Sequence, residues 1–283
     1  MTNQHKAGRP TSIIFWRWVK VAVLLYCVTG LVIYYGQESF LFHPQAVDRR
    51  TVYDFGGRPC TELNLTVDKT TNLNVVQFRA TDRPSDSLAR GVVLYFHGNS
   101  HNIAWYAPQA TDLTRKGYEV WMMDYPGFGK STGVFSEQKL YDEALLLYRL
   151  ARTRWTPSRI ILYGKSLGTG VAAQLADVRD CRRLILESPS YSMESVGWHY
   201  LPIYPWSRLL HYHFPTYLHL PAVTAPVTIF QGTRDWTVPY GNASRLKPLL
   251  KTGDEFISIE GAGHDDLRDF PLFRQKLDSV LAR

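Results

Sequence analysis

One serine lies in a short motif that is typical of enzymes with a serine nucleophile. Residues 164–168 read G-x-S-x-G with Ser166 at the centre, between a β-branched segment and a small-residue segment of helical spacing. In such a nucleophile elbow the serine sits in a tight strand-to-helix turn, where flanking glycines prevent collisions. A helix that begins at Leu167 also directs its N-terminal dipole toward the serine. The motif therefore predicts that Ser166 is a nucleophile.

A serine hydroxyl is a weak nucleophile at neutral pH unless an adjacent base removes its proton. For this arrangement we expect a histidine base oriented by a carboxylate, in the chain order serine, acid, histidine. His264 follows the last expected strand in the run G-A-G-H, and Asp235 follows the previous strand in the run G-T-R-D. Asp265 and Asp266 compete for the acid role, but sequence neighbours of a histidine rarely reach its Nδ1. We therefore predict a catalytic triad of Ser166, Asp235 and His264.

The same chemistry needs an oxyanion hole, in which each donor stabilises the transition state by roughly 3–4 kcal/mol. We expect one donor to be the backbone N–H of Leu167, the residue after the nucleophile. The other is expected from the loop 97–100, which reads H-G-N-S, with the amide of Asn99 as the donor. Gly98 permits an unusual backbone there. His97 is expected to support the loop by hydrogen bonding, and its alternative role is that of a second base.

These residues can meet only if the chain alternates strands and helices, so that the strand ends share one edge of a sheet. A short apolar run such as 91–96 (GVVLYF) is typical of a strand buried on both faces of a parallel sheet. The chain alternates such runs with helical spacing, which indicates a mostly parallel α/β sheet with helices on both faces. We expect strands at 61–67, 74–78, 91–96, 118–123, 159–163, 184–186, 227–230 and 256–259, and helices at 102–116, 137–151 and 167–176.

One segment interrupts this alternation. Residues 188–220 contain eight aromatic residues and several prolines, a higher aromatic density than in the chain as a whole. We interpret this segment as a cap insertion over the C-terminal strand ends, where ligands bind in open α/β sheets. The alternative is a long loop that packs its aromatic side chains onto the domain.

An uncharged apolar stretch lies near the N-terminus. Residues 21–36 carry no charge, and four basic residues precede the first acidic residue of the chain. About 20 helical residues span the hydrocarbon core of a bilayer, and basic flanks stay in the cytoplasm. We therefore predict a cytoplasmic tail at 1–17, a transmembrane signal anchor at 18–36 and a catalytic domain at 40–283 on the opposite side of the membrane. The alternatives are a cleaved signal peptide and a peripheral hydrophobic helix.

Composition argues against several other classes of protein. The net charge of +7 is concentrated before residue 21 and otherwise spread without a long basic run, so we expect no nucleic-acid partner. Three cysteines are too few for a disulfide scaffold and lack zinc-site spacing. Cys60 and Cys181 form the one candidate pair, and we expect all three cysteines to be unpaired. The chain has no phosphate-binding glycine motif, and we expect neither a cofactor nor a metal.

Together these motifs resemble the α/β-hydrolase superfamily, and within it the single-pass, membrane-anchored α/β-hydrolase-domain proteins. The signature motifs of these proteins match residues 97–99 (HGN), 124–131, 164–168, 232–235 and 261–264. The resemblance covers residues 40–283 and implies the fold and the triad. It also implies an activity among lipid esterases, protein thioesterases and peptidase-like enzymes, without indicating the substrate. Lys165 in the elbow and the aromatic cap depart from the family pattern.

We therefore expect a cofactor-independent serine hydrolase that cleaves carboxylic ester or thioester bonds of acyl or lipid-like substrates through an acyl-enzyme. A peptidase or amidase of the same fold is the first alternative, and Glu194 is the one acidic cap residue available to bind an N-terminal amine. A non-catalytic, membrane-tethered binding protein is the second. A dehalogenase would need an aspartate in place of Ser166. Acyl length, oligomeric state and host compartment do not follow from the sequence.

Overall fold

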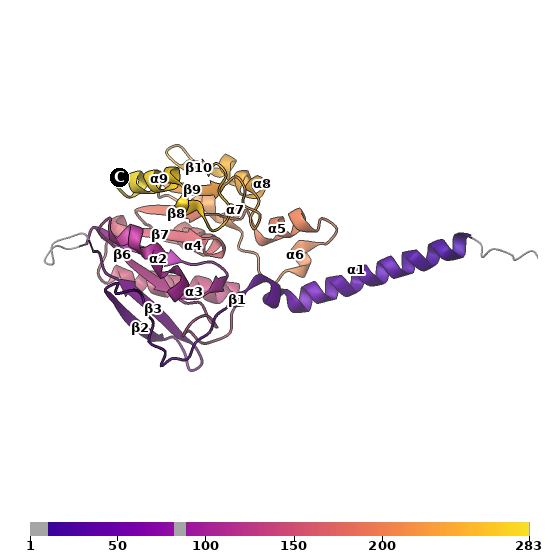
Figure 1. Ribbon diagram of the computed structural model, residues 1–283, viewed down its shortest axis with the longest axis horizontal. Helices are drawn as coiled ribbons and strands as arrows, with labels where there is room; N and C mark the ends of the chain where they lie inside the picture. The colour runs from indigo at the N-terminus through magenta and orange to yellow at the C-terminus, as the bar shows by residue number, and fades with distance from the viewer. Residues whose placement is uncertain (1–10, 82–88, 283) are drawn as a thin grey trace, which may run out of the picture.

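The computed structural model describes residues 11–81 and 89–282, so most of the expected tail at 1–17 lies outside the described part. The described residues form an eight-stranded sheet in the order β10-β9-β8-β7-β4-β6-β3-β2 (Figure 1). Its strands are β2 (Cys60–Thr66), β3 (Asn72–Phe78), β4 (Gly91–Phe96), β6 (Tyr118–Met123), β7 (Ile160–Lys165), β8 (Arg183–Glu187), β9 (Val227–Gly232) and β10 (Glu255–Ile259). The β2–β3 and β3–β6 pairs are antiparallel, and the other pairs are parallel.

Helices cover both faces of this sheet. On one face lie α3 (Glu137–Arg152) and α4 (Leu167–Val178), and on the other lie α2 (Ile103–Thr114) and α9 (Pro271–Ala282). Successive residues of β4 alternate between the two apolar clusters, so the whole strand is buried. Shorter helices complete the body: η1 (Pro157–Arg159), α8 (Tyr240–Ala243), η3 (Ser244–Leu249) and η4 (Leu267–Asp269).

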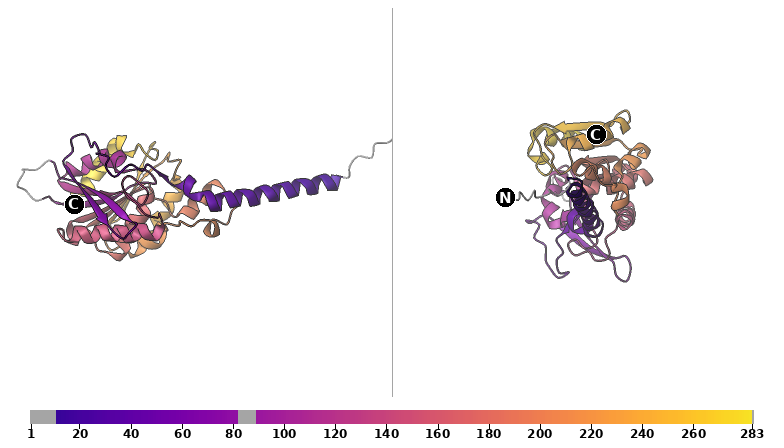
Figure 2. Two further views of the ribbon diagram at one scale, coloured as in Figure 1. Left: turned by 90° about the horizontal axis from the view of Figure 1, so that it is seen from below. Right: turned by 90° about the vertical axis from the view of Figure 1, so that its right-hand side faces the viewer.

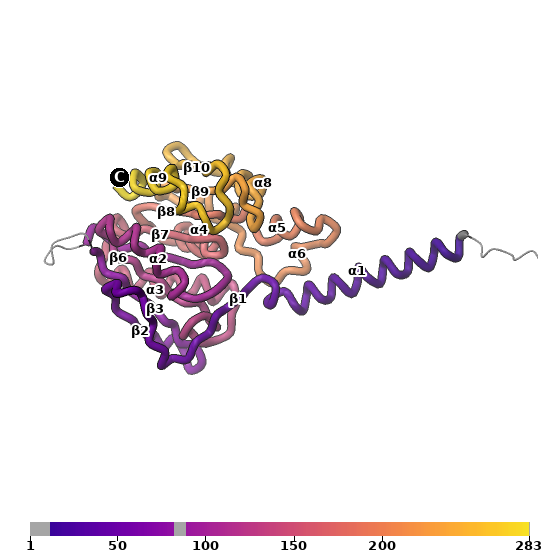
Figure 3. Tube along the Cα trace, viewed as in Figure 1, coloured from indigo at the N-terminus to yellow at the C-terminus, as the bar shows by residue number. Residues whose placement is uncertain are grey.

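The chain leaves the sheet after β8 and builds the segment that we interpreted as a cap. This segment, described throughout, contains α5 (Met193–Tyr200), α6 (Trp206–Leu209), α7 (Thr216–His219) and the start of η2 (Leu220–Ala222) (Figure 3). Tyr204, Trp206, Tyr212 and Phe214 are buried, whereas Trp198 is exposed. The segment therefore packs part of its aromatic side chains inward and presents others to its surroundings.

The helix α1 (Thr11–Leu41) projects from the body and extends beyond the predicted span 18–36 at both ends (Figure 2). Its length and composition are sufficient for a membrane crossing. Beyond it the chain forms β1 (His43–Pro44), which pairs in parallel with β5 (Ser100–His101). This pair joins the end of α1 to the loop that follows β4.

The predicted mostly parallel α/β sheet is confirmed, and the ends of its strands and of α2, α3 and α4 lie within about two residues of those expected. The strand β7 runs on to Lys165 because that residue pairs with Glu187 of β8. Cys27, Cys60 and Cys181 are all unpaired, as expected.

Candidate active site

Ser166 occupies the tight turn between β7 and α4. Its φ of 51° lies in the left-handed region, which costs a non-glycine residue about 1–3 kcal/mol. Its amide donates to the carbonyl of Glu187 at 2.8 Å, which holds the turn against β8. A Cβ at Gly164 would lie 2.4 Å from the carbonyl oxygen of Gly168, and one at Gly168 would lie 2.1 Å from that of Phe96. The motif therefore forms a strand–turn–helix elbow that only glycines at these positions permit.

The imidazole of His264 lies between Ser166 and Asp235. Its Nε2 is 2.9 Å from Ser166 Oγ, and its Nδ1 is 2.8 Å from Asp235 Oδ2, both hydrogen-bond distances. When Nδ1 donates to the carboxylate, Nε2 is left to accept the serine proton. The fold thus brings together three predicted residues that follow three different strands.

Four hydrogen bonds hold the carboxylate of Asp235, which is buried. Its Oδ1 accepts from the amides of Thr237 and Val238 at 2.9 and 2.7 Å. Its Oδ2 accepts from Nε2 of Gln231 at 3.0 Å, in addition to His264. Sequence reasoning missed Gln231, whose one available signal is a polar residue in an otherwise apolar strand run ahead of the acid.

The carboxylates of Asp265 and Asp266, which competed for the acid role, point to other partners. Asp265 Oδ1 lies 3.4 Å from Nζ of Lys165, and Asp266 Oδ1 accepts from the amide of Gly263 at 2.6 Å. Asp266 therefore shapes the loop that presents His264, while Asp235 faces the imidazole.

The loop after β4 runs beside the nucleophile. A Cβ at Gly98 would lie 3.7 Å from Cβ of Ser166, so this backbone passes alongside the serine. The side-chain amide of Asn99 donates to the backbone carbonyl of Leu41, the last residue of α1, at 2.5 Å. The backbone carbonyl of Asn99 accepts from the amide of His43 at 2.8 Å. Leu167 begins α4, where no preceding helical carbonyl can accept its N–H. Both expected donor residues therefore flank the serine, and the chain leaving α1 holds one of them.

His97 is fully buried within the same loop. Its ring centroid lies 5.0 Å from that of Tyr106 and 4.2 Å from that of Tyr125. Its Nδ1 is 2.7 Å from the carbonyl oxygen of Gly98, and the Tyr125 hydroxyl donates to the His97 carbonyl at 2.8 Å. These contacts are those of a residue that supports the loop, the first of its two expected roles.

A buried ionic network lies behind the elbow. Nζ of Lys165 is 2.9 Å from Glu187 Oε1, the hydroxyl of Tyr163 donates to the same carboxylate, and Nη2 of Arg268 lies 3.7 Å from Oε2. Burial alone would raise the pKa of Glu187, but the charges of Lys165 and Arg268 outweigh it and lower that pKa to about 2. The sequence signal for this network was Lys165 itself, a cation between an apolar strand and Ser166.

Three histidines of the segment 188–220 lie against different partners. Nδ1 of His213 lies 2.5 Å from Glu194 Oε1, and Nδ1 of His219 lies 2.8 Å from an α4 aspartate. The His211 ring packs edge-on against Tyr34 of α1. Among the described residues, no group of three or more histidine, cysteine or acidic side chains could hold a metal ion.

The chain is similar in sequence to one family model and to several curated proteins. The model of the serine aminopeptidase S33 hydrolase family matches residues 87–219. The chain is 31% identical over 199 residues to the alpha/beta hydrolase domain-containing protein 17C of Xenopus tropicalis, covering 69% of this chain and 62% of that protein. It is 34% identical over 176 residues to an uncharacterized protein of Mycobacterium tuberculosis, covering 62% of this chain and 63% of that protein. The chain thus spans less than two thirds of the length of these curated relatives.

Solved structures share the fold at low sequence identity. The Pyrococcus furiosus esterase Pf2001 matches with a TM-score of 0.66 and 18% identity, covering 86% of this chain and 98% of that one. A Paleococcus ferrophilus monoacylglycerol lipase matches with a TM-score of 0.57 and 19% identity, covering 74% and 98%. Fold, family model and relatives agree: this chain has the fold of the α/β hydrolases and is similar in sequence to α/β-hydrolase-domain proteins.

Proposed function

We propose that this protein is a serine hydrolase that cleaves carboxylic ester or thioester bonds through a Ser166–His264–Asp235 triad and an acyl-enzyme. The observation that carries the proposal is the position of the His264 ring, 2.9 Å from Ser166 Oγ and 2.8 Å from Asp235 Oδ2. A hydroxyl, a base and an orienting carboxylate in this order are what nucleophilic acyl transfer requires.

In the proposed mechanism Ser166 Oγ attacks the substrate carbonyl while Nε2 of His264 takes the hydroxyl proton. Asp235 keeps the imidazole oriented and stabilises the imidazolium that forms. The amides of Leu167 and Asn99 donate to the oxyanion of the tetrahedral intermediate. His264 then protonates the leaving alcohol or thiol, and the acyl group remains on the serine. Water attacks this ester with His264 as the base, which releases the acid and restores the serine.

We propose acyl or lipid-like substrates for this site. The support is the apolar helix α1, whose last residue is bonded to Asn99, and the aromatic cap after β8. The names esterase and monoacylglycerol lipase, carried by two proteins of similar fold, agree with this substrate class.

The test is labelling of the full chain in detergent with a fluorophosphonate, which reacts with activated serines. We expect wild type to be labelled and Ser166→Ala to be unlabelled with an unchanged circular dichroism spectrum. A screen of p-nitrophenyl esters of increasing chain length then ranks the acyl groups. Folded wild type that resists labelling and hydrolyses no ester would overturn the proposal and favour a membrane-tethered binding protein.

Amide cleavage is the second candidate, because the matching family is described as serine aminopeptidase. An aminopeptidase needs an acidic group for the substrate amine, and the acidic cap residue Glu194 is already engaged by His213 at 2.5 Å. We therefore favour esters and thioesters. Parallel assays with an ester and an amide of the same acyl group separate the candidates, and faster amide turnover would reverse our preference.

We further propose that residues 18–36 of α1 anchor the chain in a membrane with a cytoplasmic N-terminus. The domain at 40–283, with its cap at 188–220, then lies on the opposite side of the membrane. The support is the apolar composition of α1 and the position of Arg17 and Lys20 at its N-terminal side. Retention in the pellet after alkaline carbonate extraction would support the anchor. Protease digestion of sealed vesicles tests the orientation, since a body digested from the cytoplasmic side contradicts it.

A further inference from the structure

The tip of the cap exposes large apolar side chains. Trp198, Tyr200 and Ile203 keep 50%, 52% and 62% of their surface exposed, and Leu201 beside them is exposed as well. The hydroxyl of Tyr200 donates to the carbonyl of Trp236, whose side chain is 85% exposed. These five residues, which we call the apolar edge, come from two separate segments and lie together.

Packing inside the cap holds the apolar edge in this exposed position. A Cβ at Gly197 would lie 2.5 Å from the ring of Trp206, so the glycine lets α5 and α6 close on each other. Nε1 of Trp206 also donates to the carbonyl of Leu201 at 2.9 Å. The buried indole thus fixes the turn whose side chains point outward. Exposed apolar clusters of this kind mark interaction sites.

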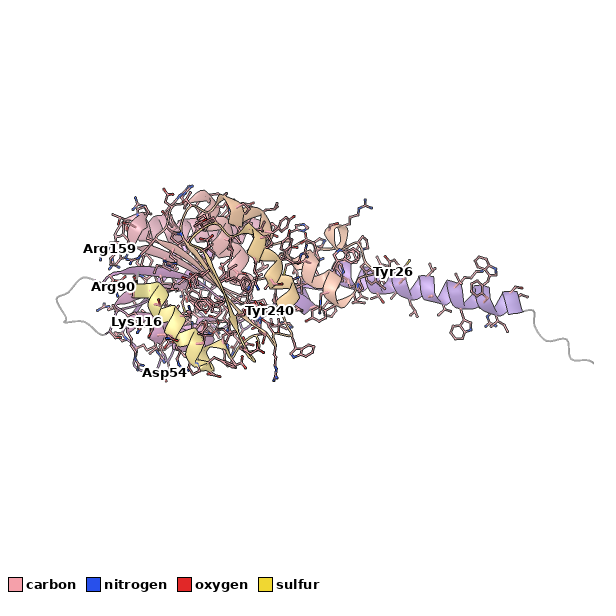
Figure 4. All side chains as sticks on the ribbon, turned by 90° about the horizontal axis from the view of Figure 1, so that it is seen from above. Tyr26, Asp54, Arg90, Lys116, Arg159 and Tyr240 are labelled. Carbon is pink, nitrogen blue, oxygen red and sulfur yellow. The ribbon has the colours of Figure 1, made fainter. Side chains whose placement is uncertain are left out.

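The apolar edge reaches the apolar helix α1 at Ile203, whose carbonyl accepts from the hydroxyl of Tyr26, a residue in the middle of that helix (Figure 4). The rings of Tyr204 and Tyr26 stack with centroids 4.6 Å apart, and the Tyr204 hydroxyl donates to the Tyr26 carbonyl at 3.0 Å. The Tyr26 hydroxyl in turn donates to the carbonyl of Ile203 at 3.1 Å. Farther along the helix, Gln37 donates to the carbonyl of Leu209 at 3.1 Å. The cap is therefore attached to the second half of the helix at several points.

The length of α1 determines where the apolar edge lies when this helix crosses a bilayer. The stretch from Thr11 to Leu25, which projects beyond the cap contact (Figure 1), is about 22 Å long at 1.5 Å per residue. The hydrocarbon core is about 30 Å thick, and Arg17 and Lys20 occupy part of this stretch. A crossing along the membrane normal therefore includes at least about 8 Å of helix from Tyr26 onward, where the cap lies alongside.

We propose that the apolar edge is immersed in the bilayer leaflet next to the body, and that acyl substrates reach Ser166 along it from that leaflet. Tryptophan and tyrosine are the side chains that favour the membrane interface. Residues 195–220 include no acidic residue, and the exposed Arg208 can reach lipid phosphates. Trp236 directly follows Asp235, so one end of the apolar edge lies next to a residue of the proposed triad. Immersion rests on the membrane crossing of α1, and the route rests in addition on the proposed hydrolase function.

Immersion is tested with a fluorescent probe on the full chain in phosphatidylcholine vesicles. The dye NBD is attached to Ile203→Cys in a background without the three native cysteines, which are unpaired. Val178→Cys is the control, since this exposed residue ends α4 on the side away from Ser166. We expect 5-doxyl lipid to quench the probe at 203 and leave the probe at 178 unquenched. Equal quenching at both positions, or none at 203, would overturn the immersion.

The route is tested by comparing two esters. Ile203→Asp keeps the backbone carbonyl that bonds Tyr26 but puts a charge into the edge proposed to be immersed. We expect it to hydrolyse an ester dissolved in the vesicle membrane about tenfold more slowly than wild type, and p-nitrophenyl acetate within about twofold of wild type. Equal rates of wild type and variant on both esters, or equal losses on both, would overturn the route. Wild type inactive on both esters would instead refute the proposed function, and the quenching result would still decide immersion.

Discussion

Replacing Gly168 with alanine tests whether the contact between β4 and α4 sets the geometry of the oxyanion hole. A Cβ at this position would lie 2.1 Å from the carbonyl oxygen of Phe96 and 2.7 Å from that of His97. Real Cβ atoms essentially never approach a heavy atom within 3.0 Å, and both neighbours here are backbone. The end of β4 and the start of α4 must therefore separate by about 0.9 Å or more.

This separation acts on catalysis because Phe96 and His97 lead into the loop of Asn99, while Gly168 follows Leu167. The two proposed oxyanion donors thus move apart. Misplacement by about 1 Å costs of the order of 100-fold in rate, and loss of one oxyanion donor costs about 10²–10³ in kcat. We expect the kcat of Gly168→Ala to fall about 10²–10³-fold with little change in KM. The free energy of unfolding should fall by about 1–3 kcal/mol, as for other overpacked positions.

The assay is steady-state hydrolysis of p-nitrophenyl butyrate, together with urea unfolding of the same preparations. Gly241→Ala in α8 is the matched control, because nothing lies within 4 Å of its added Cβ. We expect it to keep the wild-type kcat and to be up to about 1 kcal/mol more stable than wild type. A folded Gly168→Ala with wild-type kcat would refute the reasoning, since the added carbon would then have been accommodated without moving either donor.

Three further substitutions probe the charges of the body. Asp235→Asn should lower kcat about 10⁴-fold on the same ester with unchanged folding, because the amide favours the wrong imidazole tautomer. Glu187→Gln removes the buried carboxylate 2.9 Å from Lys165 Nζ, leaves only the exposed Asp265 near that ammonium, and should destabilise the chain by about 3–5 kcal/mol at pH 7. The pKa of Glu187 is lowered to about 2, so the stabilisation by its carboxylate is complete above the ordinary pKa of 4.5 and is lost as pH falls toward 2. Urea unfolding should therefore show a smaller difference in stability between wild type and Glu187→Gln at pH 3 than at pH 7. Burial raises the pKa of Glu143 to about 8, so its contribution to stability falls as pH rises from the ordinary value of 4.5 toward 8. Glu143→Met has no carboxyl to ionise, so its free energy of unfolding relative to wild type should rise between pH 5 and pH 9 in the same assay, by about 1.4 kcal/mol for each unit by which the pKa is raised.

The sheet was predictable because each buried strand has a recognisable local sequence pattern. Runs such as 91–96 and 118–123 are short, apolar and flanked by polar turns, and the observed strands have the same bounds. The positions of Ser166, Asp235 and His264 follow from the same pattern, because each residue comes directly after a strand of a parallel sheet. Their distances to one another were outside the reach of sequence, although the shared edge of the sheet made their proximity expected.

Contacts between distant segments could not be predicted. The bond between the Tyr204 hydroxyl and the Tyr26 carbonyl joins residues 178 positions apart, and nothing local in either segment indicates the other. The attachment of Asn99 to the end of α1 is equally remote in sequence. Lys165 was visible as an unusual residue, but its partner Glu187 looked like the end of an ordinary strand. Patterns of burial show which residues lie inside, and only the fold shows which of them meet.

The direction in which α1 leaves the body determines what the site faces. Chain order alone permits an N-terminal helix to depart from either edge of the sheet, because β2, the first strand of the main sheet, lies at its margin. The short β1–β5 pair removes this freedom, since His43 pairs with Ser100, directly after Asn99. The helix must therefore leave from the edge that holds the carboxyl ends of the parallel strands, where Ser166 lies. If α1 enters a bilayer from that edge, as proposed above, the proposed site faces the lipid, and the two paired residues of β1 join the proposed anchor to the loop beside Ser166.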